Sequence, residues 1–141
     1  MKMTIVAAVL LGVCLAVHSP NLCAQTCQEE ESATTAVKQD LIQMAGTIQK
    51  ESLDDFQKHF HQQSFASRLS ISLQTVGDLL GCLDKASRDP AATKSQLDAI
   101  KTKQAAYQKL QTDLQNDSQS LKSAKKAKAA KAAIEKFDFA S

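Results

Sequence analysis

Two cysteines, Cys27 and Cys82, restrict the fold of this chain more than any other feature of its sequence. The chain contains four cysteines, but Cys14 and Cys23 lie in an N-terminal segment that we expect to be removed during export. In an oxidising compartment the remaining two most simply form one intramolecular disulfide, which closes a loop of about 55 residues. An intermolecular bridge and a pair of free thiols are the alternatives.

The expected export rests on the N-terminal segment. Lys2 gives the start a positive charge, an uncharged apolar run covers residues 4–17, and Ala24 places a small residue at the end of the polar stretch that follows. This order is typical of a secretory signal peptide, and the run is shorter than the roughly 20 residues that span a bilayer. We therefore expect residues 1–24 to be cleaved and the protein to be secreted, into the extracellular space or into the periplasm of a bacterium. A retained membrane anchor is the alternative, whereas cleavage leaves residues 25–141 as a single domain without a transmembrane segment.

Composition and apolar spacing favour helices. With only 4 glycines and 2 prolines in 141 residues, the chain has too few turn-forming residues for an all-β fold, which needs a turn about every 8–12 residues. Apolar residues instead recur at spacings of three and four, which is the period of an α-helix. The longest such series comprises Phe65, Leu69, Leu73, Val76, Leu80 and Leu83.

We predict five helical segments, at residues 28–50, about 52–62, 65–87, 90 to at least 115, and a Lys/Ala-rich C-terminal helix at about 120–136. Ser52 and Asp89 are N-cap residues at two of these starts, and a proline follows Asp89 directly. A polar cluster at residues 116–120 predicts a bend between 116 and 126. The predicted fold is therefore all-α: a small antiparallel, up-down bundle of three to four helices tied by one disulfide.

The disulfide also predicts where the chain turns back. If residues 28–62 formed one straight helix that returned near residue 63, Cys82 would lie about 27 Å from Cys27 along the bundle. A disulfide needs Cα atoms within about 7 Å of each other. An intramolecular bond therefore requires a turn around residues 50–60, where the apolar stripe of the first helix also ends.

No group of residues predicts an enzyme or a cofactor site. Outside the expected signal peptide the histidines are His59 and His61, which would point about 200° apart on one helix and so could not share an ion. Asp55 and His59 would share a helix face, which is more typical of a solvated surface than of a metal site or a proton relay. Nucleotide-binding, zinc-protease and calcium-loop motifs are absent from the sequence. We predict no catalytic residue, no cofactor and no bound metal.

The C-terminal segment is strongly basic, although the net charge of the chain is only +2. Its lysines are Lys122, Lys125, Lys126, Lys128, Lys131 and Lys136. One interpretation is a basic amphipathic helix that contacts an anionic surface or a polyanion. The other is a solvated helix that packs against the acidic first helix. Since no aromatic residue stands between the lysines to stack on bases, we expect no specific nucleic-acid recognition.

Asn116 begins an Asn-Asp-Ser sequon in the predicted bend, and in a eukaryotic secretory pathway it would be a glycosylation acceptor. In a typical bacterium the sequon has no meaning.

These features favour a secreted, non-enzymatic binding or interaction module with a protein partner. One alternative is a carrier for a small apolar ligand or lipid, with a cavity lined by Met44, Phe56, Phe60, Phe65 and Tyr107. A second alternative is association with an anionic surface through the basic C-terminal helix.

Overall fold

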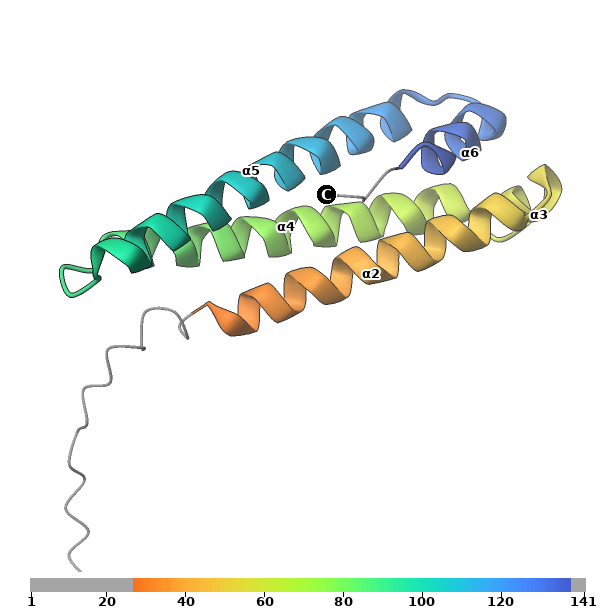
Figure 1. Cartoon of the computed structure of the whole chain (residues 1–141). Helices are drawn as coiled ribbons and strands as arrows, with labels where there is room; N and C mark the ends of the chain where they lie inside the picture. Colours follow the sequence, from red (N-terminus) through yellow and green to blue (C-terminus); the bar gives the residue numbers. More distant parts are fainter. Residues whose placement is uncertain (1–26, 138–141) are drawn as a thin grey trace, which may run out of the picture.

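The computed structural model describes residues 27–137, and all regular secondary structure in this range is helical (Figure 1). The helices are α2 (Gln28–Lys50), α3 (Leu53–Lys58), α4 (His61–Ser87), α5 (Lys94–Ser123) and α6 (Ala127–Glu135). The predicted all-α fold is confirmed. The described residues form five helices, as many as the predicted segments: three long ones, α2, α4 and α5, and the short α3 and α6. The predicted signal peptide, residues 1–24, lies outside the described residues.

The three long helices lie side by side, with α4 in the middle (Figure 1). Helix α4 packs against α2 and against α5, and α6 turns back to contact α2, α3 and α5 at one end. The predicted stripe of α4 supplies the core, since Phe65, Leu69, Val76 and Leu83 are buried. Because α4 is covered on two sides, its buried face also includes Leu79, which the predicted stripe leaves out.

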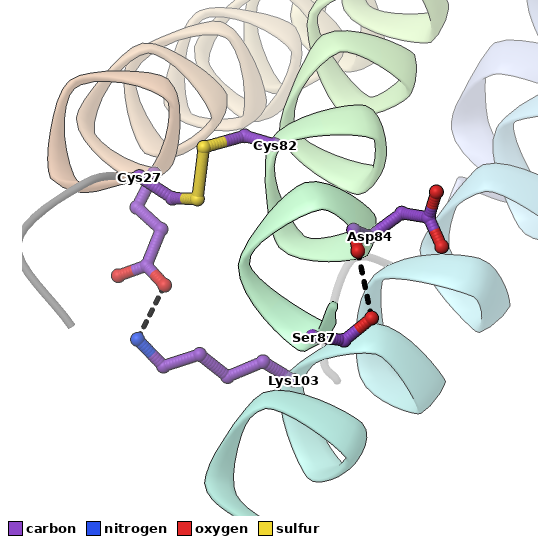
Figure 2. Close-up of a disulfide and its surroundings, with 6 residues drawn as sticks. Cys27, Cys82, Asp84, Ser87 and Lys103 are labelled. Atoms are coloured by element: carbon purple, nitrogen blue, oxygen red, sulfur yellow. Dashed lines mark hydrogen bonds and ion pairs between the residues drawn. A yellow bond between two sulfur atoms is a disulfide. The ribbon is translucent and has the colours of Figure 1, made fainter. Parts of the chain in front are cut away.

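The Cys27–Cys82 disulfide joins the start of α2 to the last two turns of α4, with the two Cα atoms 5.9 Å apart (Figure 2). The predicted intramolecular pairing is therefore present in the structure. Beside it, the ammonium group of Lys103 on α5 pairs with the carboxylate of Glu31 on α2. The disulfide end of the bundle thus fastens α2 to both other long helices.

The chain turns back between residues 51 and 60, as the disulfide argument requires. The hydroxyl of Ser52 accepts a hydrogen bond from the Asp55 backbone N–H at 3.1 Å, so Ser52 is the N-cap of α3 as predicted. Helix α3 ends at Lys58, however, and Phe60 has left-handed backbone angles, φ 52° and ψ 34°. The predicted segment 52–62 is therefore too long, and α4 begins four residues before the predicted start.

The predicted start of the fourth segment, at residue 90, is wrong, because α5 begins at Lys94. The Asp89 carboxylate accepts a hydrogen bond from the Ala91 backbone N–H at 2.8 Å, which closes a turn instead of capping a helix. The N-cap is Thr93, which forms a reciprocal capping box with Gln96. A second cap with two side-chain hydrogen bonds, only four residues downstream, determines where α5 begins.

The predicted break between residues 116 and 126 is present, but it lies at the C-terminal end of that range, beyond the polar cluster. Helix α5 continues through the polar cluster to Ser123, and the helix breaks only at residues 124–126. Leu114 and Leu121 are both buried on one face, so burial of this stripe outweighs the turn preference of the polar residues between them. The basic segment is consequently divided between the end of α5, a short connection and α6.

Candidate functional site

An open groove runs between α2 and α5, and its cavity measures about 610 Å³. We call it the α2–α5 groove. Its lining residues are Thr34, Thr35, Lys38, Gln39 and Ile42 on α2, and Ala106, Tyr107, Lys109, Leu110, Asp113, Leu114 and Asp117 on α5. Both helices pack against α4, so the groove lies where a further helix would complete a four-helix arrangement.

The groove presents apolar surface to solvent. Ile42 is 45% exposed, which makes it one of the few large apolar side chains left open among residues 27–137. Tyr107 and Leu110 are half-buried opposite it on α5, and both line the groove. Burial raises the pKa of the Tyr107 hydroxyl; the carboxylate of Glu31 adds to the rise and the ammonium group of Lys103 opposes it. An apolar occupant of the groove would cover the exposed surface of Ile42, Tyr107 and Leu110.

Two polar groups of the groove are poorly satisfied. Thr34 is only 2% exposed, and its hydroxyl forms no hydrogen bond with any described residue. Burial raises the pKa of the Asp117 carboxyl from 3.8 to about 6, with a further contribution from Asp113 one helical turn away. Perturbed carboxyl groups and unsatisfied buried polar atoms both destabilise a fold and are common at binding sites.

Substitution of Asp117 by asparagine is expected to stabilise the protein at pH 7 by about 1 kcal/mol, after allowance for solvent screening of this partly exposed side chain. The folded-state pKa lies above the unfolded value, so the stability that Asp117 contributes is fully present below about pH 4 and is lost as pH rises through 6. Urea denaturation at pH 7 and at pH 3.5 measures this. The gain should disappear at the lower pH, and Asp78→Asn on the exposed face of α4 serves as the control. An equal gain at both pH values would contradict the assignment.

The five residues predicted to line a carrier cavity do not share a single cavity. Phe56 and Phe65 are fully buried within the packed core, and Met44 packs against it. Phe60 is 68% exposed and, together with Phe56, lines a separate open pocket of about 260 Å³. Only Tyr107 of this group lines the α2–α5 groove.

The six lysines of the basic segment occupy three different elements. Lys122 lies in the last turn of α5, and Lys125 and Lys126 lie in the connection that follows. The other three, Lys128, Lys131 and Lys136, belong to α6 or its C-cap. All are exposed except Lys131, whose side chain is half-buried and pairs with Glu135. Helix α6 does pack on α2, but at the far end from the acidic residues that begin that helix.

A second cluster lies at the turn between α3 and α4, where Glu51, His59 and His61 come together. The sequence argument that separated the two histidines assumed a single helix through both, and this premise is wrong because Phe60 interrupts it. Asp55 does not join the cluster through its side chain; its carboxylate accepts a hydrogen bond from the Ser52 hydroxyl at 2.7 Å. No sequence spacing rule brings Glu51 to these histidines.

Asn116 is exposed on α5, within the helix rather than in a turn. Its use as a glycosylation acceptor stays a prediction. Within residues 27–137, no helix combines the length and the apolar character needed to cross a membrane.

Comparison with known proteins assigns no family to the chain. No protein family matches it, and no similar protein was found among curated proteins or among solved structures. The function is therefore inferred from the residues of the groove themselves.

Proposed function

We propose that this chain is a secreted, non-enzymatic binding module that receives an amphipathic helix of a partner protein in the α2–α5 groove. The observation that carries the proposal is the groove itself, an open trough of about 610 Å³ between two long helices. Secretion is supported by the Cys27–Cys82 disulfide, since such bonds persist in oxidising compartments.

The shape of the groove favours a helical occupant. The three long helices present two flanks and a floor, and an amphipathic helix in such a groove buries its apolar face against side chains of its neighbours. Ile42 and Leu110 stand on opposite flanks, so a row of apolar side chains on the partner could contact both. Covering Ile42 would remove apolar surface from water, and each Å² so buried contributes about 25 cal/mol to the free energy of binding.

The charges of the groove favour a basic residue on that helix. Lys109 already pairs with Asp113 at 3.3 Å. The Asp117 carboxylate is disfavoured by its burial and by Asp113, so a cation beside it would restore its ionised form. We therefore expect the partner helix to carry a lysine or arginine next to its apolar face.

The basic segment supports its alternative function less well. Its lysines are distributed over α5, a connection and α6 instead of lining one helix face, and Lys131 is already paired. Association with an anionic surface gains most from a continuous basic face opposite an apolar one. The groove therefore carries the proposal.

The experiment uses a synthetic amphipathic peptide of about 18 residues, long enough to span about 27 Å as a helix, with leucines on one face and one lysine beside them. Fluorescence anisotropy measures its binding to the wild-type protein and to two variants. Ile42→Glu places a charge in the groove. Ile71→Glu is the matched control, because Ile71 is similarly exposed, at 54%, and lies on α4 outside the groove lining.

We expect Ile42→Glu to weaken peptide binding by about tenfold or more, whereas Ile71→Glu should bind like wild type. Laurate, a small apolar ligand, is tested in parallel. Laurate binding that depends on Ile42, without peptide binding, would replace the proposal by the carrier alternative. Binding of neither probe, or equal weakening by the two variants, would also refute it.

A further inference from the structure

We propose that Glu51, His59 and His61 form a binding site for a divalent transition-metal ion of the zinc class. We call these three residues the junction cluster. It comprises the C-cap of α2 and the turn between α3 and α4, and its residues do not line the α2–α5 groove. The proposal is therefore independent of the proposed function.

The potential ligand atoms of the junction cluster lie within 4.8 Å of one another. The Nε2 atom of His61 is 2.9 Å from Glu51 Oε2, and the Nδ1 atom of His59 is 4.0 Å from Glu51 Oε1. The two imidazole rings meet edge to face, with their centroids 5.4 Å apart. Around a tetrahedral zinc ion with bonds near 2.0–2.1 Å, ligand atoms stand about 3.4 Å apart. The 4.0 Å between His59 Nδ1 and Glu51 Oε1 exceeds this spacing by a few tenths of an ångström, which a rotation of the exposed His59 side chain would remove.

The backbone at Phe60 creates this arrangement. On a continuous helix His59 and His61 would diverge, but the left-handed conformation of the residue between them brings both rings toward Glu51. Such a conformation is unfavourable for a bulky residue. The Phe60 side chain is 68% exposed, so its burial offsets little of this cost. Residues held in such strained conformations are common at functional sites.

Glu51 supplies a carboxylate that already faces one of the two imidazoles. The imidazole of His61 hydrogen-bonds to Glu51 Oε1 at 3.1 Å. Glu51 Oε2 is buried, and His61 Nε2 lies 2.9 Å from it. A zinc ion bound between the two groups would take both as ligands and neutralise the buried carboxylate.

The ligand types select the class of ion. Two imidazole nitrogens and one carboxylate suit zinc and its neighbours in the transition series, whereas magnesium and calcium prefer all-oxygen sites. Three protein ligands leave a fourth position for water, as in open zinc sites. His59 is the outermost ligand, with 59% of its side chain exposed, so this position faces solvent.

The test is isothermal titration of the untagged protein with zinc chloride, because a histidine tag would itself bind the metal. We expect one zinc ion per chain, a melting temperature that rises with zinc concentration, and shifted or broadened imidazole resonances of His59 and His61 in NMR spectra. His59→Gln should weaken binding by about tenfold or more, and His61→Gln likewise. Asp54→Asn is the matched control, since it removes an exposed carboxylate of α3 outside the cluster.

His59→Gln decides the outcome, because its exposed side chain can be replaced without disturbing the core. Equal zinc affinity in wild type and in this variant would overturn the proposal, as would the absence of zinc binding to the wild type. An equal loss of affinity in Asp54→Asn would show a diffuse acidic surface and would also overturn it. Circular dichroism of each variant establishes that the helices are intact.

Discussion

Reduction of the Cys27–Cys82 disulfide is expected to lower the free energy of unfolding by about 4 kcal/mol. The bond closes a loop with a sequence separation of 55 residues, and a loop of this length restricts the unfolded chain by about that amount in the chain-entropy model. Domains of this size are usually stable by about 5–15 kcal/mol, so the loss is a large part of the total. Urea denaturation with and without a reductant measures the difference.

The double variant Cys27→Ser/Cys82→Ser provides a second measurement of the same effect. Its stability should match that of the reduced wild type, and added reductant should not change it further. Coincident unfolding curves for the oxidised and reduced wild type would contradict the prediction. A dimer in non-reducing mass spectrometry would show that the cysteines pair between chains.

Substitution of Phe65 by alanine is expected to lower the free energy of unfolding by about 3–5 kcal/mol, the usual range for removal of a buried phenylalanine. Phe65 is fully buried on α4, and its ring stacks on that of Phe137 with centroids 4.9 Å apart. The cavity would open between α4 and the end of α6, where Ile134 is also buried. Chemical denaturation of the purified variant measures this loss.

Phe60→Ala is the matched control for this experiment, because it removes the same side chain from an exposed position five residues away. Its free energy of unfolding should stay within about 0.5 kcal/mol of wild type. Similar losses in the two variants would show that Phe65 is not a core residue. A loss confined to Phe65→Ala supports the packing of α6 onto α4.

The helices were predictable where one apolar stripe faces the core. The predicted segment 28–50 coincides with α2, and its Leu41 and Ile48 are buried. The disulfide adds a long-range restraint that periodicity lacks, and the turn it requires lies at residues 51–60. The spacing of apolar residues and one disulfide were therefore sufficient to predict α2 and the turn that leads from it into α4.

Helix ends were less predictable because neighbouring signals compete. Asp89 and Thr93 are both good N-cap residues, and the choice between them depends on the side chain of Gln96, which completes the second cap. At residues 116–120 the polar cluster favours a turn locally, but the buried Leu121 holds the chain in the helix. Tertiary packing therefore determines that α5 continues through residues 116–120, and a single sequence does not show this packing.

The two candidate sites were not predictable, for different reasons. The junction cluster depends on the left-handed backbone of Phe60, a conformation that no property of phenylalanine indicates. The short cap at Ser52 was visible and showed that a new helix begins there, but not that it ends after six residues. The α2–α5 groove depends on the spacing of two helices that lie far apart in the sequence. Ile42 lies outside the helical series of the first segment, which comprises Val37, Leu41, Met44 and Ile48, and such an isolated apolar residue was the one available signal.

The covalent link between α2 and α4 also determines how the molecule responds to a cut in its backbone. Exposed residues in short non-helical turns are preferred sites of proteolysis, and Phe60 is such a residue. Cleavage there produces two fragments, of which one contains Cys27 and the other Cys82. The fragments therefore remain a single molecule, and α2 stays attached to the rest of the bundle until a reductant releases it. Under the proposed secretion, a nick at this turn would leave the α2–α5 groove assembled.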